Sequence, residues 1–403
     1  MPDRDTLYRV FLKLGGAFIA FVASVVASRY LGPAGRGKLA IILSLGTLLL
    51  PLLTLNLASG IPYWMSRKPE LGPSYICNCF YALVLLGVPL LGCLALGLGL
   101  VAPDYSPVLI FISVLWTLCL AIQNIFLGIC LGLQQARFIY RLESLSCLFL
   151  LFGSLVLIAT GLFSLLSHLG HRLLLLLVID IGLMVYSSAY LRGRFRASWH
   201  LFRESLPYAI RSYVGALTTT LMWNVDHLYV NYYQGDTAVG YYSVALALVT
   251  YATLIPRAVF SDAYPELVQL SSWKARVARC WSLARKVALL VTALLLVISL
   301  VGPRLILLLY GQQFAGSLSC LQWLLPGILC LTVQETLAMA ADSKGIPTSF
   351  LLLSLCSAVL NLLLNGMWIP TYGIVGAAWA TSATYGLYLM ATVGYLWWQS
   401  QRE

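Results

Sequence analysis

Long apolar runs recur from one end of this 403-residue chain to the other, and they limit its fold more than any other feature. About 20 such residues are enough to cross the hydrocarbon core of a bilayer as a helix. In lipid, backbone polar groups must bond within their own segment, so each run is expected to be helical. Hydrophobic residues make up 60% of the chain and charged residues 10%, which excludes a soluble protein. The sequence therefore predicts an all-α, polytopic membrane protein.

Short polar breaks divide the apolar runs into about twelve expected transmembrane helices, and no break is long enough to fold as an aqueous domain. Their centres lie near residues 18, 50, 85, 120, 151, 181, 218, 248, 292, 329, 358 and 385. Residues 1–28 have the basic start and apolar middle of a signal peptide. Lys13 interrupts that apolar middle and more spans follow at once, so we expect a retained first helix.

The 25 Lys and Arg residues are shared unequally between the two sides of the membrane. With the N-terminus inside, five fall on the far side, two lie within helices and eighteen fall on the near side. Cytoplasmic loops carry such an excess. We therefore expect both termini in the cytoplasm and the protein in the cytoplasmic (inner) membrane. The net charge of +11 reports this topology, so the lipid bilayer is an expected partner and nucleic acid is not.

A shift of 203 residues aligns the chain with itself. It pairs Tyr30 with Tyr233, Gly32 with Gly235, Gly37 with Gly240 and Pro62 with Pro265. Further along, the register drifts to 211. There Gln123 and Asn124 lie over Gln334 and Glu335. This indicates an internal duplication, with a six-helix N-terminal lobe at 1–196 and a six-helix C-terminal lobe at 197–403. An even number of helices makes the two lobes parallel repeats, and a transporter of this kind has its substrate site between them.

The segment GPAGRGKL, residues 32–39, has the glycine and lysine spacing of a phosphate-binding P-loop. A P-loop requires Ser or Thr after the lysine and a strand before the glycines, whereas Leu39 follows here and the preceding segment is too long for a strand. The repeat explains the glycines better, as a tight far-side turn between the first two helices. The ten cysteines and four histidines show no metal-ligand spacing, so neither a metal nor another cofactor is expected.

Residues 360–386, LNLLLNGMWIPTYGIVGAAWATSATYG, resemble the last two helices of Wzx-type polysaccharide flippases of the multidrug/oligosaccharidyl-lipid/polysaccharide (MOP) exporter superfamily. Further similar stretches lie at 28–41, 206–246 and 309–329. The resemblance implies two lobes around a central cavity of alternating access. It also implies an anionic oligosaccharide on polyprenyl diphosphate as the substrate, exported for surface polysaccharide, with other polysaccharide assembly proteins as partners. The expected turn SHLGHR, 167–172, lacks the I-P-x-x-G-x-x-G-A-A pattern of its C-terminal counterpart.

Three cations are candidates for holding the diphosphate. Lys13 lies in the first expected helix, Arg211 in the seventh and Arg257 near the cytoplasmic end of the eighth. A charge within the membrane needs a partner, a wet cavity or a route to the interface. The resemblance implies that the first and seventh helices line the cleft between lobes, where Arg and Lys would bind phosphate. Snorkelling to the interface is the alternative for Lys13 and Arg211, and for Arg257 the alternative is an ordinary basic residue of the cytoplasmic side.

Other polar residues in the expected helices have two readings. Asp226 and Glu335 either bind a coupling cation or pair with another helix. Asn56, Gln123 and Asn124 either join helices by hydrogen bonds or bind sugar.

The predicted function is that of a flippase, not an enzyme, because the chain shows no catalytic set. A MATE-type multidrug antiporter and a lipid II flippase are the alternatives. The first four expected helices contain no carboxylate. Cation-coupled drug exporters of the superfamily that the chain resembles typically carry an acidic group in their N-terminal lobe, so the resemblance disfavours drug export. An integral-membrane enzyme of envelope synthesis is a more distant alternative.

Overall fold

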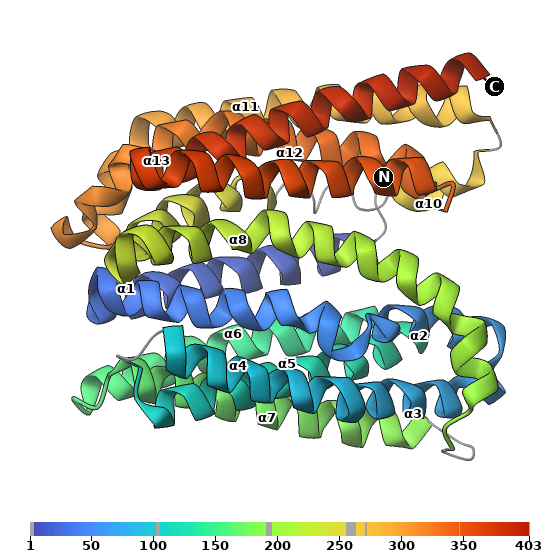
Figure 1. Ribbon diagram of the computed structural model, residues 1–403, viewed down its shortest axis with the longest axis horizontal. Coiled ribbons are helices and arrows are strands. Elements are labelled where there is room, and N and C mark those ends of the chain that lie inside the picture. The colour runs from blue at the N-terminus through green and yellow to red at the C-terminus, as the bar shows by residue number, and fades with distance from the viewer. Residues whose placement is uncertain are drawn as a thin grey trace. The chain divides into compact units, whose positions relative to one another are not determined.

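The computed structural model describes residues 4–101, 105–190, 196–254, 263–270, 272–345 and 347–402. All regular structure in these ranges is helical, which confirms the all-α prediction. The α-helices of the first half are α1 (Arg4–Thr54), α2 (Ile61–Arg67), α3 (Gly72–Ala82), α4 (Val88–Val101), α5 (Pro107–Gly132), α6 (Ala136–Ala159) and α7 (Leu165–Tyr190). The second half contains α8 (Trp199–Tyr251), α10 (Ala263–Gln269), α11 (Trp273–Leu309), α12 (Leu318–Asp342) and α13 (Thr348–Arg402) (Figure 1).

Short elements join some of these helices. A π-helical turn, Leu83–Gly87, makes α3 and α4 one continuous segment, and 3-10 turns lie at Leu57–Gly60, Pro69–Leu71 and Gln312–Ser317. The helices α1, α8 and α13 each contain a glycine with non-helical torsions, so each consists of two segments. Counted in this way, the described residues contain twelve long segments, as the apolar runs predict. Within the described ranges, eight helical stretches are long and apolar enough to span a membrane.

Packing divides the chain into two compact units. Unit 1 contains residues 1–27 and 42–220, and unit 2 contains residues 28–41 and 221–403. In unit 1, α5 packs against α2, α4 and α7, and α6 packs against α7. In unit 2, α12 packs against both α11 and α13. These units group residues by contact, whereas the lobes proposed at 1–196 and 197–403 group them by sequence repeat.

Gly32 and Gly235 have nearly the same backbone torsions, as the duplication predicts. Gly32 has φ 69° and ψ 175°, and Gly235 has φ 77° and ψ 179°. Positive φ of this size is costly for residues with a Cβ and easy for glycine. The sequence thus uses glycine to turn the chain at equivalent places in the two halves.

A second pair of glycines lets the two turns pack closely within unit 2. A methyl group on Gly37 would overlap the carbonyl oxygen of Asp236, and one on Gly240 would overlap that of Pro33. Because 33 and 236, like 37 and 240, differ by 203 residues, the contact is reciprocal. Gly37 and Gly240 therefore permit a close, pseudo-symmetric backbone contact. The segment at residues 32–39 is not a P-loop, because it lies within α1, whereas a P-loop requires a strand before its glycines.

The prediction of a turn at SHLGHR, residues 167–172, is wrong. This segment lies in α7, and the chain turns earlier, at Gly161 with φ 70°. His168 is buried, near the Ser154 hydroxyl at 3.4 Å, and its Nε2 accepts a hydrogen bond from Arg172 at 3.3 Å. Helix packing holds these polar side chains, so they do not end the helix.

The I-P-x-x-G-x-x-G-A-A segment turns the chain within α13. Gly373 has φ 60°, and the side-chain oxygen of Gln234 accepts a hydrogen bond from the next backbone N–H, of Ile374, at 3.2 Å. A methyl group on Gly376 would overlap the carbonyl of Trp368. The glycines of this pattern are therefore needed for the turn.

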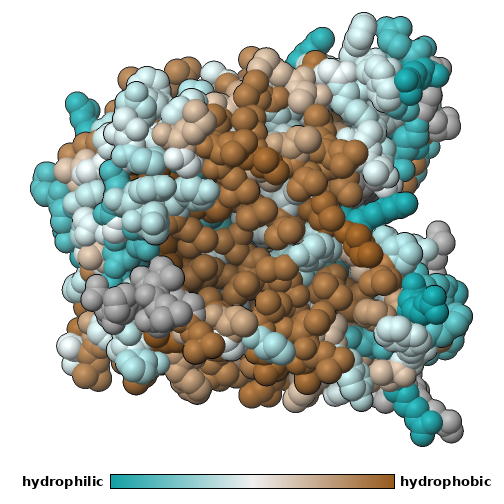
Figure 2. Space-filling view, viewed as in Figure 1, coloured by the Kyte–Doolittle hydropathy of each residue, from teal (hydrophilic) through white to brown (hydrophobic). Residues whose placement is uncertain are grey.

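On the visible face of the molecule, apolar side chains cover the middle stretches of the helices, and polar side chains gather at the helix ends (Figure 2). Large exposed hydrophobic side chains include Leu174 and Val178 in α7 and Leu289 and Leu300 in α11. An outward apolar band with polar ends is the surface expected of helices that face lipid.

Candidate functional site

The helix break that follows α1 shapes the surface around Arg211. Leu55 and Asn56 have φ of 48° and 52°, although neither is glycine. A non-glycine residue in this region costs about 1–3 kcal/mol and persists only where its surroundings hold it. The Asn56 side-chain amide donates a hydrogen bond to the Ser212 hydroxyl at 2.8 Å, and the Ser59 hydroxyl lies 2.8 Å from the same oxygen. The break is therefore tied to α8 beside Arg211.

Two exposed tyrosines extend this surface. Tyr63 of α2 and Tyr208 of α8 stack with ring centroids 5.7 Å apart and an angle of 15° between the rings. Their side chains are 41% and 46% exposed. Tyr208 precedes Ser212 by four residues, about one helical turn, so the rings and the hydroxyls share one face of α8. An exposed aromatic pair next to a hydroxyl network is suited to an amphipathic ligand.

Arg211 itself is exposed and makes no hydrogen bond or ion pair to any residue that the structure describes. Its guanidinium is available for an anion, with five donors in a planar fork. We call Asn56, Ser59, Tyr63, Tyr208, Arg211 and Ser212 the Arg211 site. All six belong to unit 1.

Lys13 is exposed in the first segment of α1, also in unit 1. It lies close enough to Glu143 of α6 for the two charges to interact. The two helices meet here, because the Ser144 hydroxyl donates a hydrogen bond to the Leu12 carbonyl at 2.9 Å. Among the described residues, no hydrogen bond or shared partner links Lys13 with Arg211. Arg257 lies outside the described residues.

Asp226 is buried inside unit 2 and accepts two hydrogen bonds. The Tyr242 hydroxyl donates one, and the backbone N–H of His227 donates the other at 2.9 Å. The Tyr242 oxygen also lies 3.2 Å from the Thr381 hydroxyl of α13. Tyr242 thus links the carboxylate of Asp226, in α8, to α13.

The other predicted polar residues lie in α5 and α12, which are the fourth segments of their respective halves. Gln123 and Asn124 are half-buried in α5 and form no hydrogen bond within the described ranges. Glu335 is half-buried in α12, and its neighbour Gln334 donates a hydrogen bond to Thr392 at 3.3 Å. The structure thus places the residues aligned by the 211-residue register on equivalent helices.

Two features were missed from the sequence. Asp180 of α7 is only 6% exposed, and neither carboxylate oxygen has a hydrogen-bond partner among the described residues. Asp180 could have been identified from the sequence, because it is the single acidic residue in the apolar run LLLLLVIDIGLMV. The pairing of Tyr63 with Tyr208 had no such signal, because the two residues are far apart in the chain and alternation of polarity does not reveal their contact.

Comparison with known proteins gives one family match. The model of the family described as "Polysaccharide biosynthesis protein" matches residues 4–271. No curated protein matches the chain.

Several solved structures share the fold. An inward-facing multidrug resistance MATE family transporter of the MOP superfamily gives a TM-score of 0.74 at 14% identity, covering 96% of this chain and 94% of that chain. The lipid II flippase MurJ in an inward closed conformation gives 0.71 at 13% identity, covering 96% and 86%. A MOP superfamily transporter from Pyrococcus furiosus gives 0.64 at 15% identity, covering 98% and 95%. At these identities the similarity shows the fold.

Proposed function

Because the chain belongs to the polysaccharide biosynthesis protein family, we propose that its substrate is an oligosaccharide repeat unit linked to polyprenyl diphosphate. The family and the fold indicate a multi-pass membrane flippase of the MOP superfamily rather than an enzyme, as the sequence resemblance predicts. In this proposal the flippase moves the substrate across the cytoplasmic membrane for surface polysaccharide export. Both termini are on the cytoplasmic side.

The observation that carries the proposal is the composition of the Arg211 site. The substrate has an anionic diphosphate, polar sugar rings and an apolar chain. Arg211 binds a phosphate through two parallel N–H···O bonds, which a point charge cannot do. Ser212, which follows Arg211 in α8, and Ser59, whose hydroxyl lies 2.8 Å from that of Ser212, supply hydroxyls to the site. The stacked, exposed rings of Tyr63 and Tyr208 offer an apolar face with polar tips for the sugars.

Lys13 contributes a second positive charge in the proposal. Its neighbour Glu143 offsets the cost of holding the ammonium in an apolar environment while the diphosphate is absent. Lys13 therefore attracts the arriving diphosphate as a point charge, and Arg211 fixes the orientation of the diphosphate. Arg257 remains a candidate third ligand on sequence grounds alone.

Transport in this proposal proceeds by alternating access. An inside-negative membrane potential favours outward movement of negative charge by about 2.3 kcal/mol per charge per 100 mV. Asp226 holds α8 to α13 through Tyr242 and Thr381, so we assign it a structural role rather than a coupling role. No further energy source is required by the proposal.

The two alternatives have structural support but less sequence support. A MATE transporter and a lipid II flippase both share the fold. The family model favours polysaccharide export over either. Lipid II also carries a diphosphate, so the glycan separates these two substrates.

The test is export in a cell that depends on this gene for a surface glycan. Arg211→Ala should abolish the glycan while the protein remains inserted at its normal level. Arg203→Ala is the matched control, because Arg203 is also exposed on α8 but lies outside the Arg211 site. Persistence of the glycan in the Lys13→Ala, Arg211→Ala double variant would overturn the role of the two cations. Loss of cell-wall synthesis rather than of the surface glycan would assign the protein to lipid II.

A further inference from the structure

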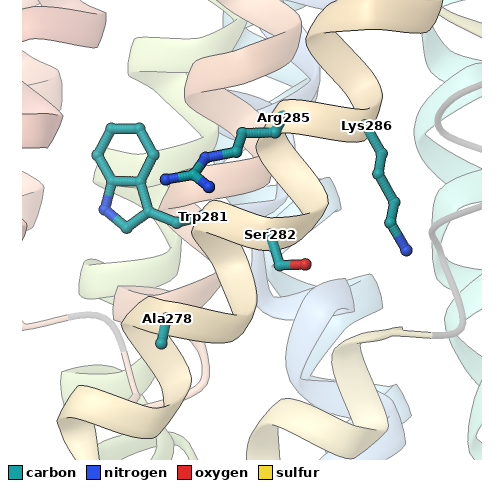
Figure 3. A pocket seen from close by; sticks show the side chains of 5 residues that line it. All are labelled: Ala278, Trp281, Ser282, Arg285 and Lys286. Atoms are coloured by element: carbon teal, nitrogen blue, oxygen red, sulfur yellow. The ribbon is translucent and has the colours of Figure 1, made fainter.

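A separate hollow of about 640 Å³ lies along α11 in unit 2 (Figure 3). It is lined by Ala278, Trp281, Ser282, Arg285 and Lys286. Ala278, Ser282 and Lys286 follow one another at intervals of four residues. Trp281 and Arg285 are also four residues apart, so the five side chains form one face of the helix. In Figure 3 the Arg285 guanidinium lies beside the Trp281 indole, and Lys286 extends on the other flank, near Ser282. Two cationic heads thus lie on either side of a hydroxyl. We call these five residues the α11 pocket.

The two cations of the α11 pocket are uncompensated, unlike their neighbours on the same helix. Arg276 donates to the Leu270 carbonyl at 2.7 Å, and Arg279 pairs with Glu266 at 2.8 Å. Arg285 and Lys286 make no hydrogen bond or ion pair within the part of the chain that the structure describes. The fold therefore uses the first arginines of α11 internally and leaves the later pair open.

The position of the pair along α11 corresponds to the headgroup level of a bilayer. The basic stretch KARVARCWSLARK ends at Lys286, and the apolar stretch VALLVTALLLVISLV follows directly. With 37 residues α11 is longer than the hydrocarbon core requires, since about 20 residues suffice. Its basic first part must lie outside that core. Trp281 is half-buried against the core of unit 2, and tryptophan is enriched at this level of the membrane.

The same face of α11 continues into the membrane as an apolar stripe. Leu289, Leu296 and Leu300 follow Arg285 and are 75%, 60% and 78% exposed. They lie four, eleven and fifteen residues after Arg285, which places them on one face of the helix with Arg285 and Ser282. A ligand with an anionic head in the pocket would have its chain along this stripe.

We propose that the α11 pocket binds the phosphodiester headgroup of an anionic bilayer phospholipid, with an acyl chain on the leucine stripe. Arg285 and Lys286 bind the phosphate oxygens, Ser282 donates a hydrogen bond, and Trp281 packs beside the headgroup. Lys and Arg residues directly beside a transmembrane segment on the cytoplasmic side attract anionic lipid headgroups. The lining offers only one hydroxyl and no exposed tyrosine pair, so it suits a phosphodiester better than a glycan. The site is distinct in residues and unit from the Arg211 site.

Native mass spectrometry of the purified full chain tests the proposal. Delipidated protein is mixed with phosphatidylglycerol or with phosphatidylcholine, and the bound fraction is measured. The wild type should retain phosphatidylglycerol preferentially, and the double variant Arg285→Gln, Lys286→Gln should bind it roughly thirtyfold more weakly, as expected for the loss of two basic residues at the membrane surface. Lys274→Gln, an exposed cation of the same helix outside the pocket, should leave binding unchanged. Lys286→Arg keeps the charge and should retain binding, which controls for folding.

Three results would overturn the assignment. Equal retention of phosphatidylglycerol by the wild type and the double glutamine variant would show that the pocket is not the binding site. Equal binding of inorganic phosphate and phosphatidylglycerol would show that the acyl chain and the leucine stripe are not needed. Displacement of phosphatidylglycerol by an equal amount of polyprenyl phosphate would assign the pocket to the transported lipid. Glycan export by the Arg211→Ala variant is a separate readout, so failure of either proposal is recognised independently.

Discussion

A methyl group added at Gly37 or Gly240 tests the reciprocal packing of the two repeat turns. Each methyl would overlap a backbone carbonyl oxygen, which cannot rotate away as a side chain can. Overpacking of this kind costs about 1–3 kcal/mol. Both glycines are helical, so alanine recovers up to about 1 kcal/mol of helix propensity. We therefore expect each variant to lose about 1–2 kcal/mol of stability.

Thermal denaturation of the purified protein in detergent, followed by size-exclusion chromatography, measures this loss. For a unit of roughly 200 residues, about 2–4 °C per kcal/mol predicts a fall of about 2–8 °C in Tm. Gly386→Ala is the matched control, because Gly386 is helical and has no atom within 4 Å of an added methyl. It should be neutral or stabilising. If Gly37→Ala and Gly240→Ala melted like Gly386→Ala, the reciprocal contact would be refuted.

Three further variants test particular contacts. Ser212→Ala removes the hydroxyl that accepts the Asn56 hydrogen bond, which costs about 1 kcal/mol. Glycan export should fall several-fold while the amount of inserted protein stays the same. Unchanged export would contradict the view that this hydrogen-bond network supports Arg211. Tyr208→Ala should reduce export and Tyr208→Phe should preserve it, because phenylalanine keeps the stacked ring; an equal loss in both would exclude a role for the ring face. Asp180→Asn should raise Tm by a few degrees, since a neutral amide costs less to bury than an unpaired carboxylate; a lower Tm would indicate a partner that the described structure lacks.

Much of the fold follows from the sequence because a bilayer permits few solutions. Hydropathy predicted the helical segments, since an apolar run in lipid has no alternative to internal backbone bonding. The 203-residue register predicted equivalent turns at Gly32 and Gly235, because only a special backbone conformation requires glycine at both places. The turn at SHLGHR was mispredicted, because polar residues resemble a break when their buried partners are unknown. The grouping of residues 28–41 with unit 2 depends on tertiary packing that no local pattern encodes.

The candidate site was less predictable than the fold. Charge in an apolar run identified Lys13 and Arg211, since such charges are rare enough to stand out. The same reasoning, applied throughout, would have found Asp180. The bonds from Asn56 and Ser59 to Ser212 and the stacking of the two tyrosines join residues more than 140 positions apart. Contacts of this kind arise from packing between helices and leave no periodic trace in a single sequence.

Transbilayer movement in proteoliposomes tests the central claim most directly. A labelled oligosaccharide on polyprenyl diphosphate is placed in vesicles that contain the wild type, Arg211→Ala or Arg203→Ala, and its transfer to the opposite leaflet is timed. The proposal predicts rapid transfer by the wild type and by Arg203→Ala, and transfer by Arg211→Ala no faster than in empty vesicles. Equal rates for the wild type and Arg211→Ala would contradict the claim that Arg211 holds the diphosphate.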